Sequence, residues 1–276
     1  MKSYQEIKDI ITNQLGITDL KSYEAWSQRF LWAGQIPDQQ PRKPSQEDID
    51  LLSPDNIDNN AFWRIAEELF QTDPVANCQG KTPLSVAEAN KENLNIYHLD
   101  GITGFINVAY SKWNALQNRT YPLLEIGPGY GAFREWLDKQ GGWEYYGADV
   151  YPRITGVDAT QPNGLLDEIT LNRRYAVVVA CNVFQHLSVN QRIHYYRDIQ
   201  KCLMPQGHFI VNMMVDDGRV TSHRSEYGAV YCRHYGQLTL IQRRAEIESD
   251  LGRFFALDSV VSRHQGTWLT FRCTHK

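Results

Sequence analysis

Hydrophobic positions divide the chain into a helical first part and a second part in which strands alternate with helices. Before Asn118 the apolar side chains recur every three or four positions, as around Ile7 and Ile11, and no segment has the pattern of a strand. We therefore expect residues 1–92 to form a helical N-terminal extension or cap and residues 93–276 to form an α/β domain.

The second part predicts a doubly wound sheet. The run Tyr175–Ala180 is apolar throughout, rich in β-branched residues and bounded by polar ones, which is typical of a strand buried on both faces. Helical patterns separate most of the strands, and two last strands follow each other with only His264-Gln265-Gly266 between them. The other expected strands are Pro122–Gly127, Trp143–Ala148, Ile154–Val157, His208–Met213, Phe255–Ser262 and Thr267–Cys273.

One short run between an expected strand and an expected helix indicates a ligand-binding turn. It reads Leu-Leu-Glu-Ile-Gly-Pro-Gly-Tyr-Gly-Ala-Phe from Leu123 to Phe133, so a carboxylate at Glu125 is followed by glycines at alternate positions. Glycine lets the backbone turn sharply and approach a ligand closely. The spacing Gly127-x-Gly129-x-x-Ala132 also satisfies the dinucleotide fingerprint. A carboxylate directly before the turn would repel a pyrophosphate, whereas it would attract an ammonium or a sulfonium.

This run resembles motif I of the class I S-adenosylmethionine (SAM) dependent methyltransferases. Later segments are similar to that family in the same order: an acidic residue at Asp149, another at Asp158, and a stretch that ends in His186-Leu187. The resemblance covers about residues 93–276. It implies a mostly parallel seven-stranded sheet that a terminal antiparallel hairpin closes, and SAM as the cofactor.

Cofactor contacts follow from these positions. Asp149 lies about 20 residues after the glycine turn, where a carboxylate accepts hydrogen bonds from both ribose hydroxyls. The resemblance implies that Asp158 accepts a hydrogen bond from the adenine amino group. A role as N-cap of the segment Leu165–Ile169 explains Asp158 nearly as well. The expected cofactor-binding residues are Glu125, Gly127, Pro128, Gly129, Asp149, Val150, Asp158, Ala159 and Asn182.

The reaction expected from this family is methyl transfer to a small molecule, with a hydroxyl oxygen of a sugar or natural-product intermediate as the first choice. A general base that removes the proton of a hydroxyl acceptor raises the rate of transfer. The candidates for this base are His186, His223 and His234. Tyr227 and Tyr231 are candidates to line the acceptor pocket. The alternatives are N-methylation of a small amine, a NAD-type oxidoreductase and a non-catalytic SAM-binding module.

Composition and charge bear on the binding partners and the cellular location that we expect. The 276 residues carry a net charge of −4 with no basic stripe, which disfavours nucleic acid. Five dispersed cysteines without a C-x-x-C pair suit reduced thiols, and no signal peptide or membrane-spanning run is present, so we expect a cytoplasmic protein. Asp216-Asp217 suggests a metal, yet the neighbouring strand tip Cys181-Asn182 adds no carboxylate, so we expect none.

Overall fold

The computed structural model describes residues 4–15, 91, 101–117, 120–150, 152, 154, 156–160, 165–216, 223–225, 228–232, 238–263 and 268–276. The chain divides into two compact units. The smaller unit contains Met1–Leu84, His186–Val189 and Val220–Ile241, and the larger unit contains Ser85–Gln185, Asn190–Arg219 and Gln242–Lys276. Most of the predicted N-terminal cap lies outside the described residues, so the division at 92/93 stays a prediction; the helical pattern around Ile7 and Ile11 forms α1 (Tyr4–Leu15).

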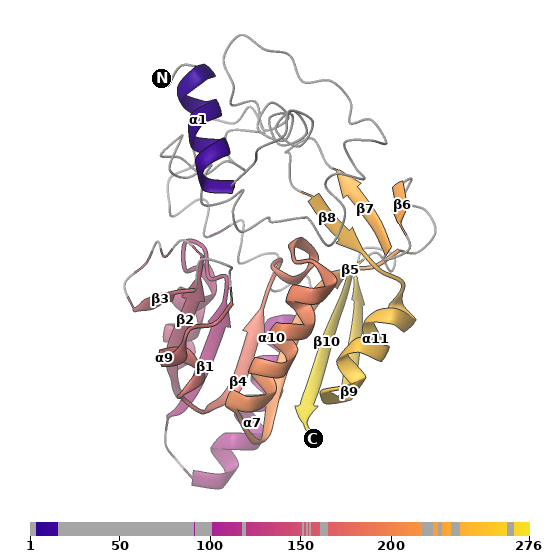
Figure 1. Cartoon of the computed structure of the whole chain (residues 1–276). Coiled ribbons are helices and arrows are strands. Elements are labelled where there is room, and N and C mark those ends of the chain that lie inside the picture. Colours follow the sequence, from indigo (N-terminus) through magenta and orange to yellow (C-terminus); the bar gives the residue numbers. More distant parts are fainter. Residues whose placement is uncertain are drawn as a thin grey trace. The chain divides into compact units, whose positions relative to one another are not determined.

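The larger unit is built on a seven-stranded sheet with the order β3-β2-β1-β4-β5-β10-β9 (Figure 1). The five strands from β3 to β5 are mutually parallel, whereas β10 runs antiparallel to both β5 and β9. The expected fold class is confirmed, including the terminal hairpin. The strands are β1 (Tyr121–Ile126), β2 (Trp143–Asp149), β3 (Val157–Ala159), β4 (Tyr175–Ala180), β5 (Leu203–Met214), β9 (Phe255–Arg263) and β10 (Trp268–His275).

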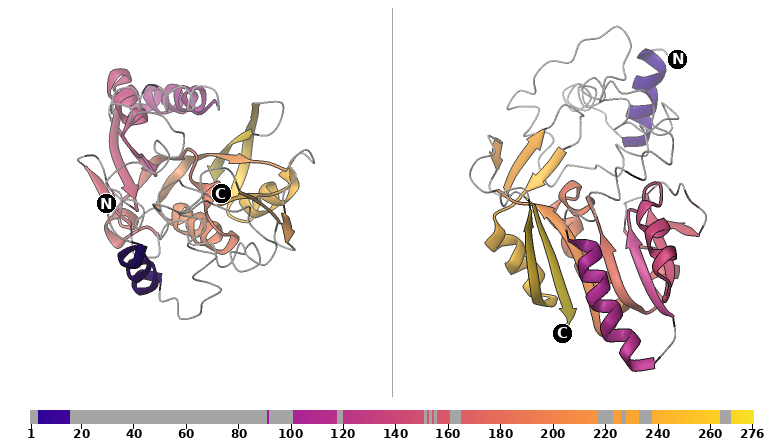
Figure 2. Two further views of the ribbon diagram at one scale, coloured as in Figure 1. Left: turned by 90° about the horizontal axis from the view of Figure 1, so that it is seen from above. Right: turned by 180° about the vertical axis from the view of Figure 1, so that it is seen from behind.

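Helices cover both faces of this sheet, as the apolar pattern of the central strands requires. Every residue of β4 is buried. In Figures 1 and 2, α7 lies behind the sheet, while α10 and α11 lie in front. The described helices after residue 100 are α7 (Ile102–Gln117), α8 (Ala132–Gln140), α9 (Glu168–Leu171), α10 (Val189–Cys202) and α11 (Arg244–Gly252), with a 3₁₀ turn η1 (Phe184–His186).

Each face has its own core. On the α7 side, Ile102 and Ile106 pack with Phe133 of α8 and with alternate residues of the strands, such as Val179 and Ile210. The α10 side is aromatic. Its rings are Phe184, Tyr196, Phe209 and Phe255, with Phe184 stacked on Tyr196 at 5.5 Å and Phe209 lying 5.3 Å from Phe255. The two cores hold the strand ends in place, and the candidate site lies at those ends.

Two predicted elements differ from the structure. The third strand was expected at Ile154–Val157, but β3 covers Val157–Ala159, so Asp158 lies within the strand and pairs with Ala148. The stretch Val215–Gln237 was expected as a loop. It contains β6 (His223–Ser225) and β7 (Gly228–Cys232), which form a three-stranded antiparallel sheet of the smaller unit with the following strand β8 (Leu238–Ile241).

Among the described residues, no helix has the length and apolar character needed to cross a membrane.

Candidate functional site

The glycine turn after β1 depends on glycine at three positions. Gly127, Gly129 and Gly131 have φ values of 71°, 54° and 81°, in the left-handed region that other residues rarely adopt. A Cβ at Gly127 would lie 2.3 Å from Cγ2 of Val183, so the turn packs tightly against the tip of β4. At Gly129 a Cβ would meet no atom of the described residues within 4 Å. With respect to the described residues, the turn is therefore closed on the Val183 side and open at Gly129.

Asp149 at the end of β2 holds the middle of this turn. Its Oδ2 accepts a hydrogen bond from the backbone N–H of Gly129 at 3.1 Å, and the side chain is 7% exposed. The parallel register places Ile126 of β1 beside Ala148, so the turn and Asp149 follow neighbouring strand ends. A charged acceptor on a backbone N–H strengthens such a bond and orders the turn. The structure thus brings together two features that the sequence predicted separately.

Glu125 is fully buried directly before the turn. Its Oε2 accepts a hydrogen bond of 2.7 Å from the hydroxyl of Tyr145 on β2. Burial, and next the charge of Glu125, raise the pKa of Tyr145 far above its ordinary value, so the phenol keeps its proton and donates a hydrogen bond to the carboxylate. The adjacent Gly147 leaves room here, because a Cβ would lie 3.1 Å from the Tyr145 hydroxyl and 3.3 Å from Pro128. Neither Tyr145 nor Gly147 was among the site residues expected from the sequence.

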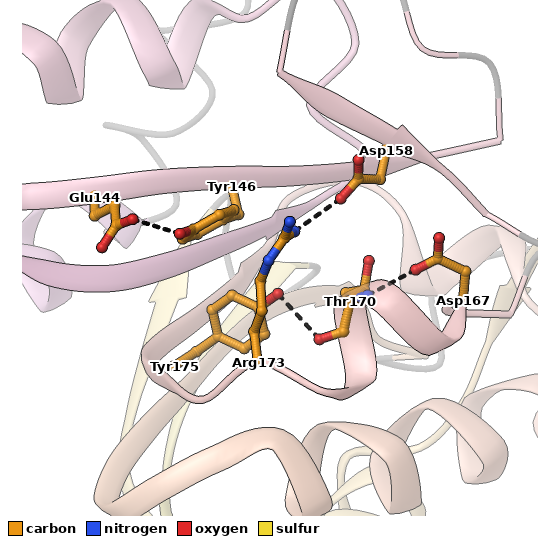
Figure 3. Close-up of polar contacts among 7 residues, drawn as sticks. All are labelled: Glu144, Tyr146, Asp158, Asp167, Thr170, Arg173 and Tyr175. Atoms are coloured by element: carbon orange, nitrogen blue, oxygen red, sulfur yellow. Dashed lines mark hydrogen bonds and ion pairs between the residues drawn. The ribbon is translucent and has the colours of Figure 1, made fainter.

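Asp158 pairs with Arg173 at the edge of the sheet. Arg173 Nη1 lies 2.9 Å from Oδ2 of Asp158, and the guanidinium lies 4.4 Å from the ring centre of Tyr146 (Figure 3). Oδ1 of Asp158 makes no hydrogen bond among the described residues, and the side chain is 36% exposed. Asp158 therefore keeps one oxygen for a further donor.

The alternative that Asp158 caps the following helix is wrong. The N-cap of α9 is Asp167, whose Oδ1 accepts a hydrogen bond of 2.8 Å from the backbone N–H of Thr170 (Figure 3). The helix begins at Glu168, three residues later than expected, so Asp158 lies too far upstream to reach its first turn.

The tip of β4 has a strained backbone. Asn182 has a φ of 58°, and Asn212 of β5 bonds to it on two sides. Asn212 is fully buried in a strand that is otherwise mostly apolar. From the sequence, the segment around Asn212 was expected only as a strand. A polar residue inside such a run is the feature that could have identified it.

A buried arginine ties this tip to the chain that follows β8. Arg192 of α10 donates through Nε to the carbonyl of Phe184 at 2.7 Å and through Nη1 to the side chain of Gln242. Burial lowers the pKa of Arg192 to about 10. The carbonyl of Gln242 in turn accepts from the N–H of Asp216 at 2.9 Å. Arg192 thus fixes the loop after β4 and the segment after β5 to a common point.

For the other predicted site residues, the structure gives their position in a helix or strand, their strand pairing or their burial. His186 ends η1 and is half-buried; His223 begins β6 and pairs with Val230, and Tyr231 in β7 pairs with Thr239. Val150 directly follows β2, and Ala159 ends β3 opposite Asp149. Residues outside the described part are His234, Tyr227 and Asp217. The roles proposed for all of them stay predictions.

No group of three His, Cys, Asp or Glu side chains that could hold a metal ion occurs within the described residues. Since Asp217 is not among them, the expectation of a metal-free site stays a prediction as well.

The residues present fit the cofactor that the sequence resemblance implies. The open side of the turn at Gly129 gives room for a ligand to approach the backbone. Glu125, Asp149 and Asp158 come from the three neighbouring strands β1, β2 and β3. Carboxylates at these positions suit ribose hydroxyls, an amino group and a sulfonium better than a pyrophosphate.

A family model described as a methyltransferase domain matches residues 102–252. No curated protein matches the sequence. Among solved structures, the 1,6-didemethyltoxoflavin-N1-methyltransferase of Burkholderia thailandensis is 18% identical over 71% of this chain and 93% of its own, with a TM-score of 0.46.

Two further structures show similar values. The N-methyltransferase NodS of Bradyrhizobium japonicum is 16% identical over 67% of this chain and 86% of its own, with a TM-score of 0.42. A SAM-dependent methyltransferase of Mesorhizobium loti is 14% identical over 56% and 91%, with a TM-score of 0.43. The family model spans more than half of the 276 residues, and its match agrees with the glycine turn and the strand order. The chain belongs to the methyltransferase-domain family, that of the class I SAM-dependent methyltransferases, and is an enzyme of this class.

Proposed function

We propose that this enzyme transfers the methyl group of SAM to a hydroxyl oxygen of a small molecule. The observation that carries the cofactor part is the turn held by Asp149, which accepts from the N–H of Gly129 while the other side of Gly129 stays open among the described residues. The net charge of −4 supports a small acceptor over a polyanion.

In this proposal, the carboxylates of Asp149, Asp158 and Glu125 each interact with a different part of the cofactor. Asp149 accepts from the ribose hydroxyls, since it lies at the end of β2 beside the turn. Asp158 accepts from the adenine amino group through Oδ1, because Oδ2 already bonds to Arg173. The charge of Glu125 makes the turn attractive to the ammonium and sulfonium groups, and the backbone of Gly127, Pro128 and Gly129 lies along the methionine part. Val150, Ala159 and Asn182 complete the proposed set at the ends of β2, β3 and β4.

SAM supplies a methyl group that its sulfonium has already activated. The protein therefore has mainly to hold the acceptor in line with that methyl group, and positioning of this kind is worth about 7–11 kcal/mol. For a hydroxyl acceptor, a side chain that removes the proton adds about 10²–10⁴-fold in rate. The proposed bases are His186, His223 and His234, and Tyr227 and Tyr231 are proposed to contact the acceptor.

Calorimetric titration with SAM, S-adenosylhomocysteine (SAH) and NAD tests the cofactor part. We expect heat with SAM and SAH and none with NAD, because the carboxylates around the turn repel a pyrophosphate. Heat with NAD alone would overturn the proposal. The matched variant Asp149→Asn keeps an oxygen near Gly129 and removes the charge; we expect it to weaken SAH binding by about tenfold, the equivalent of 1.4 kcal/mol.

The acceptor and its atom need a separate experiment. A thermal-shift screen of small metabolites in the presence of SAH identifies acceptors, and methyl transfer to each hit is then measured. With a hydroxyl acceptor, one of His186→Ala, His223→Ala and His234→Ala is expected to lower kcat by about 10²-fold or more. If the acceptor is an amine, or if all three variants keep near-normal turnover, the proposed base is wrong.

A further inference from the structure

The backbone at the tip of β4 adopts a conformation that its residue type does not favour. Asn182 has a φ of 58°, and asparagine tolerates this region better than most residues, although glycine does so at much lower cost. Residues in this region persist where their surroundings hold them, and they cluster at functional sites. The question is what holds Asn182.

Asn212 supplies the bonds that hold it. The Oδ1 of Asn212 accepts from the backbone N–H of Asn182 at 2.7 Å, and its Nδ2 donates to Oδ1 of Asn182 at 3.1 Å. The same Nδ2 lies 3.5 Å from Sγ of Cys181. One fully buried side chain therefore bonds to the backbone and the side chain of the strained residue, from a strand 30 positions further along the chain.

The held tip also touches the glycine turn. Val183 directly follows Asn182, and its Cγ2 would lie only 2.3 Å from a Cβ on Gly127. The direction in which the chain leaves Asn182 decides where Val183 lies. A change at Asn182 is therefore transmitted to the turn on which the cofactor is proposed to lie.

We propose that Asn212 is a positioning residue for the cofactor site: it fixes the left-handed backbone at Asn182 and thereby the contact between the tip of β4 and the glycine turn. This inference rests on the proposed function, in which the turn and the tip bind SAM. Asn212 itself acts through Asn182 and Val183, without touching the reacting atoms.

A double-mutant cycle with SAH as the probe tests this role. Asn212→Ala removes both bonds to Asn182, and we expect the Kd for SAH to rise about tenfold in calorimetry. Asn182→Gly accepts a φ of 58° without a side-chain bond. In the N182G background, we expect the additional effect of N212A on the Kd to be about threefold or less.

A residue that only fills space in the core would give a different result in this double-mutant cycle. If Asn212 only fills space, N212A changes the SAH affinity by the same factor in both backgrounds, and that result overturns the inference. Ile210→Val is the matched control on the same face of β5, since it removes one buried methylene group; we expect it to lower Tm without changing the Kd.

Two further outcomes are distinguishable. If N212A does not fold, Asn212→Asp carries the same cycle, since it keeps an oxygen for the N–H of Asn182 and loses both donor hydrogens. An equal factor in both backgrounds would again overturn the inference. If the unmodified protein binds neither SAM nor SAH, the proposed function fails; if it binds and N212A binds equally well, only the role of Asn212 fails.

Discussion

Gly129→Ala separates the two properties of the glycine turn. The added Cβ would meet no described atom within 4 Å, so the structure offers it room, but the residue keeps a φ of 54°. The left-handed backbone costs a residue with a Cβ about 1–2 kcal/mol. For a chain of this size that corresponds to a fall in Tm of about 2–8 °C.

Affinity for the cofactor is expected to fall as well. The new methyl group lies on the open side of the turn, where the proposed ligand approaches the backbone. We expect the Kd for SAH to rise by about tenfold or more in calorimetry, a loss of about 1.4 kcal/mol or more of binding free energy that is separate from the loss of folding stability. A G129A protein that loses stability as calculated but binds SAH like the unmodified protein would refute the placement of the ligand beside Gly129.

Two other glycines serve as controls for this experiment. Gly131→Ala has a similar φ of 81°, but its Cβ would lie 2.8 Å from Cδ1 of Ile154, the flexible end of a protein side chain. It is expected to lose comparable stability with a smaller effect on SAH. Gly104→Ala in α7 has open space and an ordinary helical backbone, so it should gain about 0.5–1 kcal/mol and leave binding unchanged.

Two predictions concern stability. Tyr145→Phe removes a donor to the buried carboxylate of Glu125 and is expected to lower the free energy of unfolding in urea by about 1.5–3 kcal/mol; a loss below about 0.5 kcal/mol would contradict the contact. Burial raises the pKa of Cys202 and of Cys273 to about 12 each from 9.0. Because these thiols ionise first in the unfolded chain, stability falls as pH rises from about 9 to 12, by about 1.4 kcal/mol per thiol at pH 10. Urea titrations at pH 8 and pH 10 should show a smaller loss in the double variant C202A/C273A, and an equal loss would count against this cause.

Local patterns predicted the central part of the fold well. The apolar run Tyr175–Ala180 became β4 with the predicted bounds, since a strand buried on both faces has no polar position to blur its pattern. The glycine turn and the role of Asp149 beside it were equally predictable. The glycines that permit a left-handed backbone and the spacing of about 20 residues are both visible in the sequence.

Short or amphipathic elements were predicted less well. The strand β3 has only three residues, so its position depends on pairing with β2 more than on its own side chains. The stretch that contains β6 and β7 was expected as a loop, since it is rich in charged residues, glycine and tyrosine and gives no clear alternation. The sequence offered Asp158 as an N-cap, and only the actual start of α9 identified Asp167 in that role.

By itself the sequence determined the doubly wound sheet, its closing hairpin and the turn at which a cofactor is expected, because each depends on periodicity or on glycine over a few neighbouring residues. Only the tertiary structure decided which polar groups meet. The register between parallel strands brought Tyr145 to Glu125, 20 positions away, and Asn212 to Asn182, 30 positions away. Such contacts depend on the alignment of distant segments across a sheet, and no local pattern encodes that alignment.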